Sequence, residues 1–374
     1  MEPIYLDYAA STPTKSQVTN IFLKTLNIYG NPSSIHKEGL RAKRIIDNTS
    51  VIIANKLNCS PEEIYYTTGA TMSNNLLIQG LFRKKPETMF ITSCVEHNDI
   101  MELFDWLPYT KYLVDVDKNG IINIAQLNKY IINCENKGIP CLVSIQMANS
   151  ETGVIQLIKL ISEIVHSYKY GYLHVDATQY IPYYPIDIQK LNIDALSMSG
   201  QKIGGIKGSG ILVVRQTLKK YISPIIFGEQ GLIGGTPSTS LIASLGEAFQ
   251  LINYDINELQ NKRDFLLEKL EQLGGVLVGS REYRIPNNIY IRFPNISGMT
   301  LMNLLNEYNI YIGTGSACSA KSDKPSHVAL AYGLTSTEAL ECVRFSLGNE
   351  ITYKDLEYVV QVVKGLLKTL KGCG

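Results

Sequence analysis

The chain has 374 residues, 45% hydrophobic and 18% charged, which is the composition of a globular protein with a full core. Its 35 basic and 34 acidic residues give a net charge of +1, so we expect no direct nucleic-acid or membrane partner. The start, MEPIYLDYAAS, lacks the basic and apolar regions of a secretory signal and no apolar run approaches a membrane span, so we expect neither. Seven cysteines without a CxxC pair favour a reducing cytoplasm with free thiols over disulfides or a metal site.

Up to about residue 250, short apolar runs alternate with helical patterns. Strands are predicted over 63–67, 89–92, 141–146, 172–175, 195–198 and 211–214, with helices that open near Ser73 and span about 157–168. Strands separated by helices indicate a mostly parallel sheet, and ligands gather at the carboxyl ends of such strands.

Beyond residue 250 the pattern changes. It predicts helices over 261–275, 300–308 and 354–370, with strands over 288–293 and 343–345. We expect residues 16–250 to form a large α/β domain, and residues 1–15 with 251–374 to form a small α+β domain. The two domains are expected to share a cleft.

Lys202 lies in the segment 194–210, DALSMSGQKIGGIKGSG, directly after a predicted strand and among small residues. A lysine in a glycine-rich turn is usually a surface residue. A lysine at a strand end with little bulk around it is also what a Schiff base with pyridoxal phosphate (PLP) requires.

The ring of PLP makes further demands that the sequence meets. Asp176 in HVDATQ follows a predicted strand and could pair with the pyridine nitrogen, although it could also cap a helix. Gln179 could reach the phenolic oxygen. His97 in SCVEHNDI is placed to cover the ring face, although a lone histidine is more often structural.

A phosphate cradle is predicted at TTGATMSNN, where Gly69, Ala70 and Thr71 form the turn from a strand to a helix. Backbone N–H groups and the helix dipole favour an anion at such a turn. Ser199 and Gln201, beside Lys202, could add donors.

Cys318 lies in GTGSACSAKSDKP, residues 313–325, a polar stretch with no apolar periodicity. Cysteine usually behaves as a small buried hydrophobe, and this segment is not patterned to bury one. The thiol is therefore either incidental or a nucleophile on an accessible loop.

Ten segments between Tyr5 and Gly348 together resemble the cysteine desulfurases of the IscS/NifS type, in the class-V aminotransferase group of PLP enzymes. They are YLDYAASTP, YGNPSSIH, TTGATMSNN, EHND, ANSETGVIQ, HVDATQ, SGQKIGG, GGT, GSACSA and VRFSLG. The resemblance implies PLP-dependent transferase fold type I with a seven-stranded-type sheet. It also implies PLP as cofactor, L-cysteine as substrate and L-alanine as product.

The resemblance assigns roles by position. Lys202 would carry the Schiff base and remove the substrate Cα proton. Cys318 would attack the substrate sulfur, become a persulfide and pass sulfur to an acceptor protein. Arg344 in VRFSLG, aided by Asn31 in GNPSS, would bind the substrate carboxylate. Thr236 in LIGGTPSTS would reach the phosphate of the neighbouring subunit, which implies a homodimer.

Several positions depart from the usual family residues, among them Tyr8, Ser11 and Gln230. Ser150 stands where an asparagine normally touches the PLP phenolic oxygen, and Gln201 replaces a histidine. Met72 replaces a glutamate, and Ile233 an arginine. These departures favour a paralogue dedicated to one pathway, with iron–sulfur assembly, tRNA thiolation and DNA phosphorothioation left open. The alternatives are a selenocysteine lyase or other class-V enzyme, and a degenerate homologue that acts as a binding partner.

Overall fold

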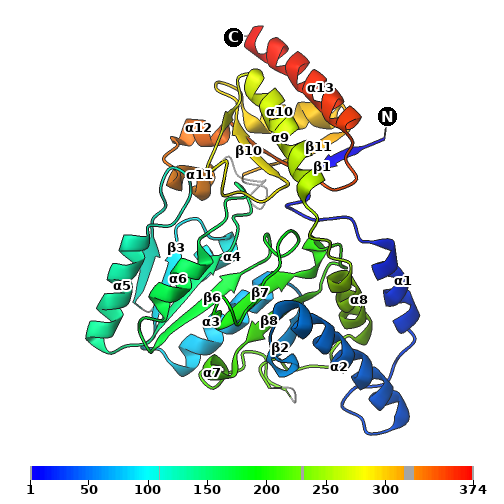
Figure 1. The fold of residues 1–374 in the computed structure, drawn as a ribbon, viewed down its shortest axis with the longest axis vertical. Helices are drawn as coiled ribbons and strands as arrows, with labels where there is room; N and C mark the ends of the chain where they lie inside the picture. Colours follow the sequence, from blue (N-terminus) through cyan, green and yellow to red (C-terminus); the bar gives the residue numbers. More distant parts are fainter. Residues whose placement is uncertain (1, 109, 229–230, 316–323, 373–374) are drawn as a thin grey trace.

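The computed structural model describes residues 2–108, 110–228, 231–315 and 324–372. Two β-sheets with helices packed around them make up this part of the chain, the smaller sheet lying above the larger one in Figure 1.

The larger sheet has seven strands in the order β2-β8-β7-β6-β5-β3-β4. Only β8 runs antiparallel to its neighbours, so the predicted mostly parallel sheet is confirmed. The strands are β2 (Ile64–Thr67), β8 (Gly210–Val214), β7 (Ala195–Ser199), β6 (Gly171–Asp176), β5 (Cys141–Gln146), β3 (Met89–Ser93) and β4 (Lys111–Val114).

Helices cover both faces of this sheet, as its alternating side chains require. On β3, Met89 and Ile91 join one apolar cluster while Phe90 between them joins another, because successive strand residues face opposite sides. The first cluster holds α2 (Lys37–Leu57), α5 (Ile124–Lys137), α6 (Ile158–Val165) and α8 (Thr239–Gln250). The second holds α3 (Ala70–Lys84), α4 (Asn98–Trp106) and the short α7 (Gln216–Lys219). The result is a three-layer α/β arrangement.

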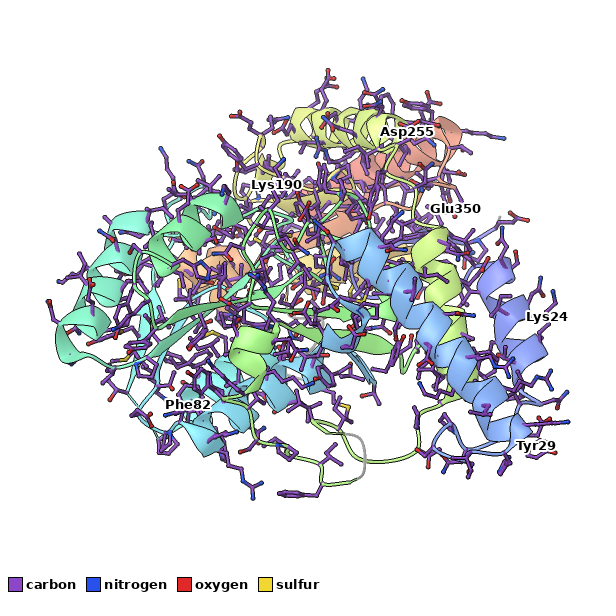
Figure 2. All side chains as sticks on the ribbon, turned by 60° about the horizontal axis from the view of Figure 1, so that its bottom comes forward. Lys24, Tyr29, Phe82, Lys190, Asp255 and Glu350 are labelled. Atoms are coloured by element: carbon purple, nitrogen blue, oxygen red, sulfur yellow. The ribbon has the colours of Figure 1, made fainter. Side chains whose placement is uncertain are left out.

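At one edge of the large sheet, α1 (Ser16–Thr25), α2 and α8 pack side by side (Figures 1 and 2). Tyr29, in the connection between α1 and α2, is 84% exposed and lies at the outer end of this group in Figure 2. This corner therefore projects away from the large sheet.

The smaller sheet has five strands in the order β1-β11-β12-β10-β9. They are β1 (Ile4–Leu6), β11 (Ile310–Thr314), β12 (Cys342–Ser346), β10 (Asn288–Arg292) and β9 (Val276–Leu277). A second core covers it with α9 (Asn257–Gln272), α10 (Gly298–Asn306) and α13 (Tyr353–Gly372). Because β1 pairs with β11, the N-terminal strand belongs to a sheet otherwise built from the C-terminal part of the chain. The domain boundaries at residues 15/16 and 250/251 stay a prediction.

The predicted strands agree with the observed ones to within one residue at each end. The helix predicted over 261–275 was placed too far along the chain, because α9 begins at Asn257 and ends before the glycine pair at 274–275. The short segments η1 (Pro61–Glu63), η2 (Gly200–Lys202), α11 (His327–Ala331) and α12 (Ser336–Leu340) complete the described elements. No helix in the described ranges is long and apolar enough to cross a membrane.

Candidate active site

A cavity of about 290 Å³ lies where the carboxyl ends of β5, β6 and β7 meet the smaller sheet. In open parallel sheets, ligands bind beyond the carboxyl ends of the strands, which is where this cavity lies. Ten predicted site residues line it: Ala70, Thr71, His97, Ser150, Asp176, Gln179, Ser199, Gln201, Lys202 and Arg344. Segments far apart in sequence thus converge as expected.

Lys202 ends η2, the single turn that directly follows β7. Its Nζ donates to the carbonyl oxygens of Ala9 at 2.6 Å and Ala10 at 2.5 Å. Gln179 donates from Nε2 to the same Ala9 oxygen at 2.9 Å. Lys202 is therefore a partly buried residue directed into the cavity, and the surface-lysine interpretation is wrong.

Asp176 ends β6, and Asn74 of α3 joins it to Asp99 of α4. Nδ2 of Asn74 donates to Asp176 Oδ2 at 3.2 Å and to Asp99 Oδ2 at 3.1 Å. Asp176 Oδ1 accepts from the backbone N–H of Thr178 at 2.9 Å, in a turn and not at a helix start. Oδ1 of Asp99 lies 2.8 Å from Nδ1 of His97. A polar chain therefore runs from the ring of His97 to the carboxylate of Asp176.

The two carboxyl groups of this chain differ in their pKa values. Burial, with the nearby charge of Asp99, raises the pKa of Asp176. For Asp99, burial also favours the protonated form. Hydrogen bonds from His97 and Asn74, with the charge of His97, outweigh that effect and hold its pKa below the usual range. A cation beside Asp176 would restore its ionised form.

The predicted phosphate cradle is formed by the first turn of α3 and the end of β7. The backbone N–H of Ala70 donates to Ser199 Oγ at 2.8 Å, which fixes the helix start against the strand end. Thr71 and Gln201 line the same cavity. The first turn of a helix presents unpaired N–H groups and the positive end of the dipole, so this corner suits an anion.

Arg344 reaches the cavity from β12 and is only 4% exposed. Its Nη2 donates to Asp7 Oδ1 at 2.6 Å, and its Nη1 donates to the carbonyl oxygen of Ser150 at 2.9 Å. Nε is buried and has no hydrogen-bond partner among the described residues. The guanidinium is thus held in one orientation at the wall of the cavity.

Two of the predicted site residues that the structure describes are not brought to this cavity. Thr236 lines a separate cavity of about 460 Å³ together with Thr68, Met72 and Ile233. Asn31 lies in the exposed α1–α2 connection, where its Oδ1 accepts from the backbone N–H of Ser33 at 2.9 Å. Cys318 lies outside the described residues.

Several polar residues of the site have no role predicted from the sequence. Asn74, Asp99 and Asp7 each contact a predicted residue, and Glu96 and Glu151 line the cavity. All five lie within or beside the segments quoted above, TTGATMSNN, EHND, YLDYAASTP and ANSETGVIQ. Their partners could not be assigned, because each contact joins segments that only the fold brings together.

The cavity fits PLP by the chemistry of its groups. A buried carboxyl group with a raised pKa suits a protonated pyridine nitrogen. The side-chain oxygens of Asn74 and Thr178 are buried and lack hydrogen-bond partners within the described part of the chain. A lysine amine and a helix start beside them complete the donor set for an aldehyde and a phosphate.

Comparison with known proteins identifies the class. Residues 4–359 match the family model for class-V aminotransferases, so the chain belongs to that family. PLP is the cofactor of this family, and the predictions of fold type and cofactor are confirmed.

Individual relatives indicate which type of class-V aminotransferase this chain resembles. The chain is 36% identical over 382 residues to the cysteine desulfurase IscS of Methanosarcina thermophila, covering 98% of this chain and 93% of that protein. A NifS-like protein of known structure superposes with a TM-score of 0.89 at 29% identity, covering 98% and 100% of the two chains. The structure of SspA in complex with cysteine superposes with a TM-score of 0.80 at 30% identity, covering 92% and 98%. The resemblance to PLP-dependent enzymes of the IscS/NifS type is thereby confirmed.

Proposed function

We propose that this enzyme converts L-cysteine to L-alanine and passes the sulfur, as a persulfide on Cys318, to an acceptor protein. The main support is that one cavity holds both the amine of Lys202 and the guanidinium of Arg344. Gly315 and His327, which bracket the segment with Cys318, line the same cavity. The relatives named as cysteine desulfurases agree with this reaction.

The residues of the large sheet would hold PLP. Lys202 would bind its aldehyde carbon, Asp176 its pyridine nitrogen, and Gln179 with Ser150 the side of the phenolic oxygen. His97 would cover the ring, held in place by Asp99. The phosphate would lie against Ala70, Thr71, Ser199 and Gln201. When bound, PLP supplies an electron sink that acidifies the substrate Cα–H and weakens the C–S bond.

Arg344 would bind the substrate carboxylate with the N–H groups that Asp7 and Ser150 leave unused. Lys202 would accept the Cα proton. The Cys318 thiolate would attack the substrate sulfur, so that an S–S bond forms as the C–S bond breaks. Alanine leaves after a proton is returned to carbon, and the protein keeps a persulfide.

We further propose a homodimer in the cytoplasm. Thr236 lines a cavity beside the phosphate corner, shared with Thr68 and Met72, where a second copy could reach it. The five cysteines within the described ranges are all free, which suits a reducing compartment. Light scattering would give the subunit number, and cell fractionation the compartment. Asn31 stays a predicted substrate contact, which L-cysteine KM in Asn31→Ala would test.

The reaction is tested by alanine formation from L-cysteine with PLP-saturated protein and a thiol reductant, beside Cys318→Ser. We expect alanine from the parent and none from the variant, with the visible absorbance of bound cofactor equal in both. Equal alanine release from both would remove Cys318 as the nucleophile. Alanine formed only from selenocysteine would indicate a selenocysteine lyase, and no turnover of either substrate would indicate a binding partner.

A further inference from the structure

Glu151 is a buried carboxyl group in the cavity that the proposed reaction does not use. It follows the Ser150 carbonyl that holds Arg344, and it is 8% exposed. Ser326 Oγ donates to its Oε2 at 2.6 Å. An ionised carboxylate buried this far needs a cation nearby, and otherwise keeps its proton.

The backbone at the end of β11 lies against both Arg344 and Glu151. Gly313 pairs with Arg344, and a Cβ at Gly313 would lie 2.8 Å from both Nη2 of Arg344 and Oδ1 of Asp7. A Cβ at Gly315 would lie 2.6 Å from Oε2 of Glu151. Glu151 also directly follows Ser150, whose carbonyl oxygen accepts from Nη1 of Arg344, so this carboxyl group and the guanidinium are close enough to interact.

Other titratable groups surround Glu151. They are Arg344 and Cys342 of β12, Tyr290 of β10, His97 before α4 and Tyr332 after α11. Burial raises the pKa of Glu151 to about 7, against the opposing effects of the Ser326 hydroxyl, Arg344 and Tyr290. Near neutral pH, Glu151 therefore exists in both its protonated and its ionised form.

We propose that Glu151 sets the charge of the substrate-carboxylate site. In its ionised form it competes with the substrate carboxylate for Arg344, and in its protonated form it leaves that guanidinium to the substrate. This inference rests on the proposed role of Arg344. Because Asp7 already pairs with Arg344, substrate binding beside an ionised Glu151 would place three carboxylates around one guanidinium. Substrate binding is therefore coupled to proton uptake by Glu151.

The test is a titration of the holoenzyme with L-alanine, which carries the substrate carboxylate but no sulfur. The change in visible absorbance of bound cofactor gives its Kd between about pH 6 and about pH 8.5, for the parent and for Glu151→Gln. We expect similar Kd values near pH 6, and binding to the parent roughly three- to tenfold weaker than to the variant near pH 8.5. Groups that titrate in both proteins cancel in the ratio. A ratio that does not change with pH would overturn the proposal.

Two further variants separate the possible failures. Ser326→Ala removes a donor that favours the carboxylate, so the pH at which L-alanine binding weakens should rise; an unchanged midpoint contradicts the proposal even if Glu151→Gln fails to fold. Arg344→Ala should abolish L-alanine binding. If it binds L-alanine normally, the proposed substrate role of Arg344 fails. If it does not bind while the Glu151→Gln ratio stays flat, only the Glu151 inference fails.

Discussion

Arg344 of β12 donates from Nη2 to Oδ1 of Asp7 at 2.6 Å and so joins two residues 337 positions apart. Asp7 arrives there because β1 pairs in parallel with β11, with Leu6 opposite Ile312. A carboxylate from the N-terminus therefore orients a guanidinium from the C-terminal sheet. In this orientation Nε is buried and has no hydrogen-bond partner among the residues that the structure describes.

Gly313→Ala should weaken substrate binding. The added methyl group would lie 2.8 Å from Nη2 of Arg344 and from Oδ1 of Asp7, so the ion pair would have to shift. We expect KM for L-cysteine to rise roughly 10–100-fold with a smaller change in kcat, measured by alanine release. Gly365→Ala is the control, because a methyl group at that helical position meets nothing within 4 Å. Equal KM values in both variants would contradict the role of the pair.

Lys202→Ala should remove the visible absorbance of bound cofactor and all alanine formation together, because the variant lacks the amine that binds the aldehyde carbon. The measurement is an absorbance spectrum of protein incubated with excess PLP and then desalted. Lys207→Ala, in the same glycine-rich segment but outside the cavity lining, is the matched control. Activity that survives in Lys202→Ala would refute the Schiff-base assignment.

Asn74→Ala should lower both stability and cofactor affinity. The side chain holds Asp99 and Asp176 together, and its loss leaves two buried carboxyl groups facing each other without the amide. We expect a loss of roughly 1–3 kcal/mol in the free energy of unfolding and weaker retention of PLP on dialysis. Asn75→Ala serves as control, since among the described residues that amide bonds to the Thr71 carbonyl and Gln79, both within α3. An Asn74 variant as stable as the control would count against the bridge.

Glu151→Gln should make the protein less sensitive to rising pH. The pKa of Glu151 is about 7 in the folded protein and near 4.5 when the chain is unfolded. Between these values the unfolded chain loses the proton while the folded protein keeps it, so rising pH favours unfolding. The loss is roughly 2–3 kcal/mol over the window and is absent from the variant. Urea unfolding near pH 5 and near pH 8 checks this; parallel changes in both proteins would exclude it.

Much of the site could be predicted because its residues occupy recognisable positions at the ends of strands. Asp176 ends β6, and Lys202 comes three residues after β7, so parallel topology alone directs both to one edge. Ala70 and Thr71 open α3 directly after β2, which marks an anion site by local structure. The apolar pattern that predicted the strands therefore also predicted where these side chains lie.

Other parts of the site depend on contacts that no local pattern contains. Asn74 looks like an ordinary helix residue until α3 packs beside α4 and the end of β6. Glu151 receives its raised pKa from burial beneath segments that come 164 and more residues later, Gly315 and Ser326. Asn31 and Thr236 were assigned by resemblance, and their places outside the Lys202 cavity reflect the three-dimensional course of α2 and α8.

Because β1 pairs with β11, the N-terminal strand can take its place in the smaller sheet only after most of the chain has been synthesised. The residues that would hold the cofactor of their own subunit have all been made once the chain passes Gln201 and Lys202, whereas Arg344 lies on β12, the strand that precedes only α13. A nascent or truncated chain that stops before β12 lacks the guanidinium, however well its large sheet has folded. In such a chain the carboxylate of Asp7 has no Arg344 guanidinium to pair with. By the roles proposed above, such fragments would at most bind the cofactor, and substrate binding would need a chain that reaches β12.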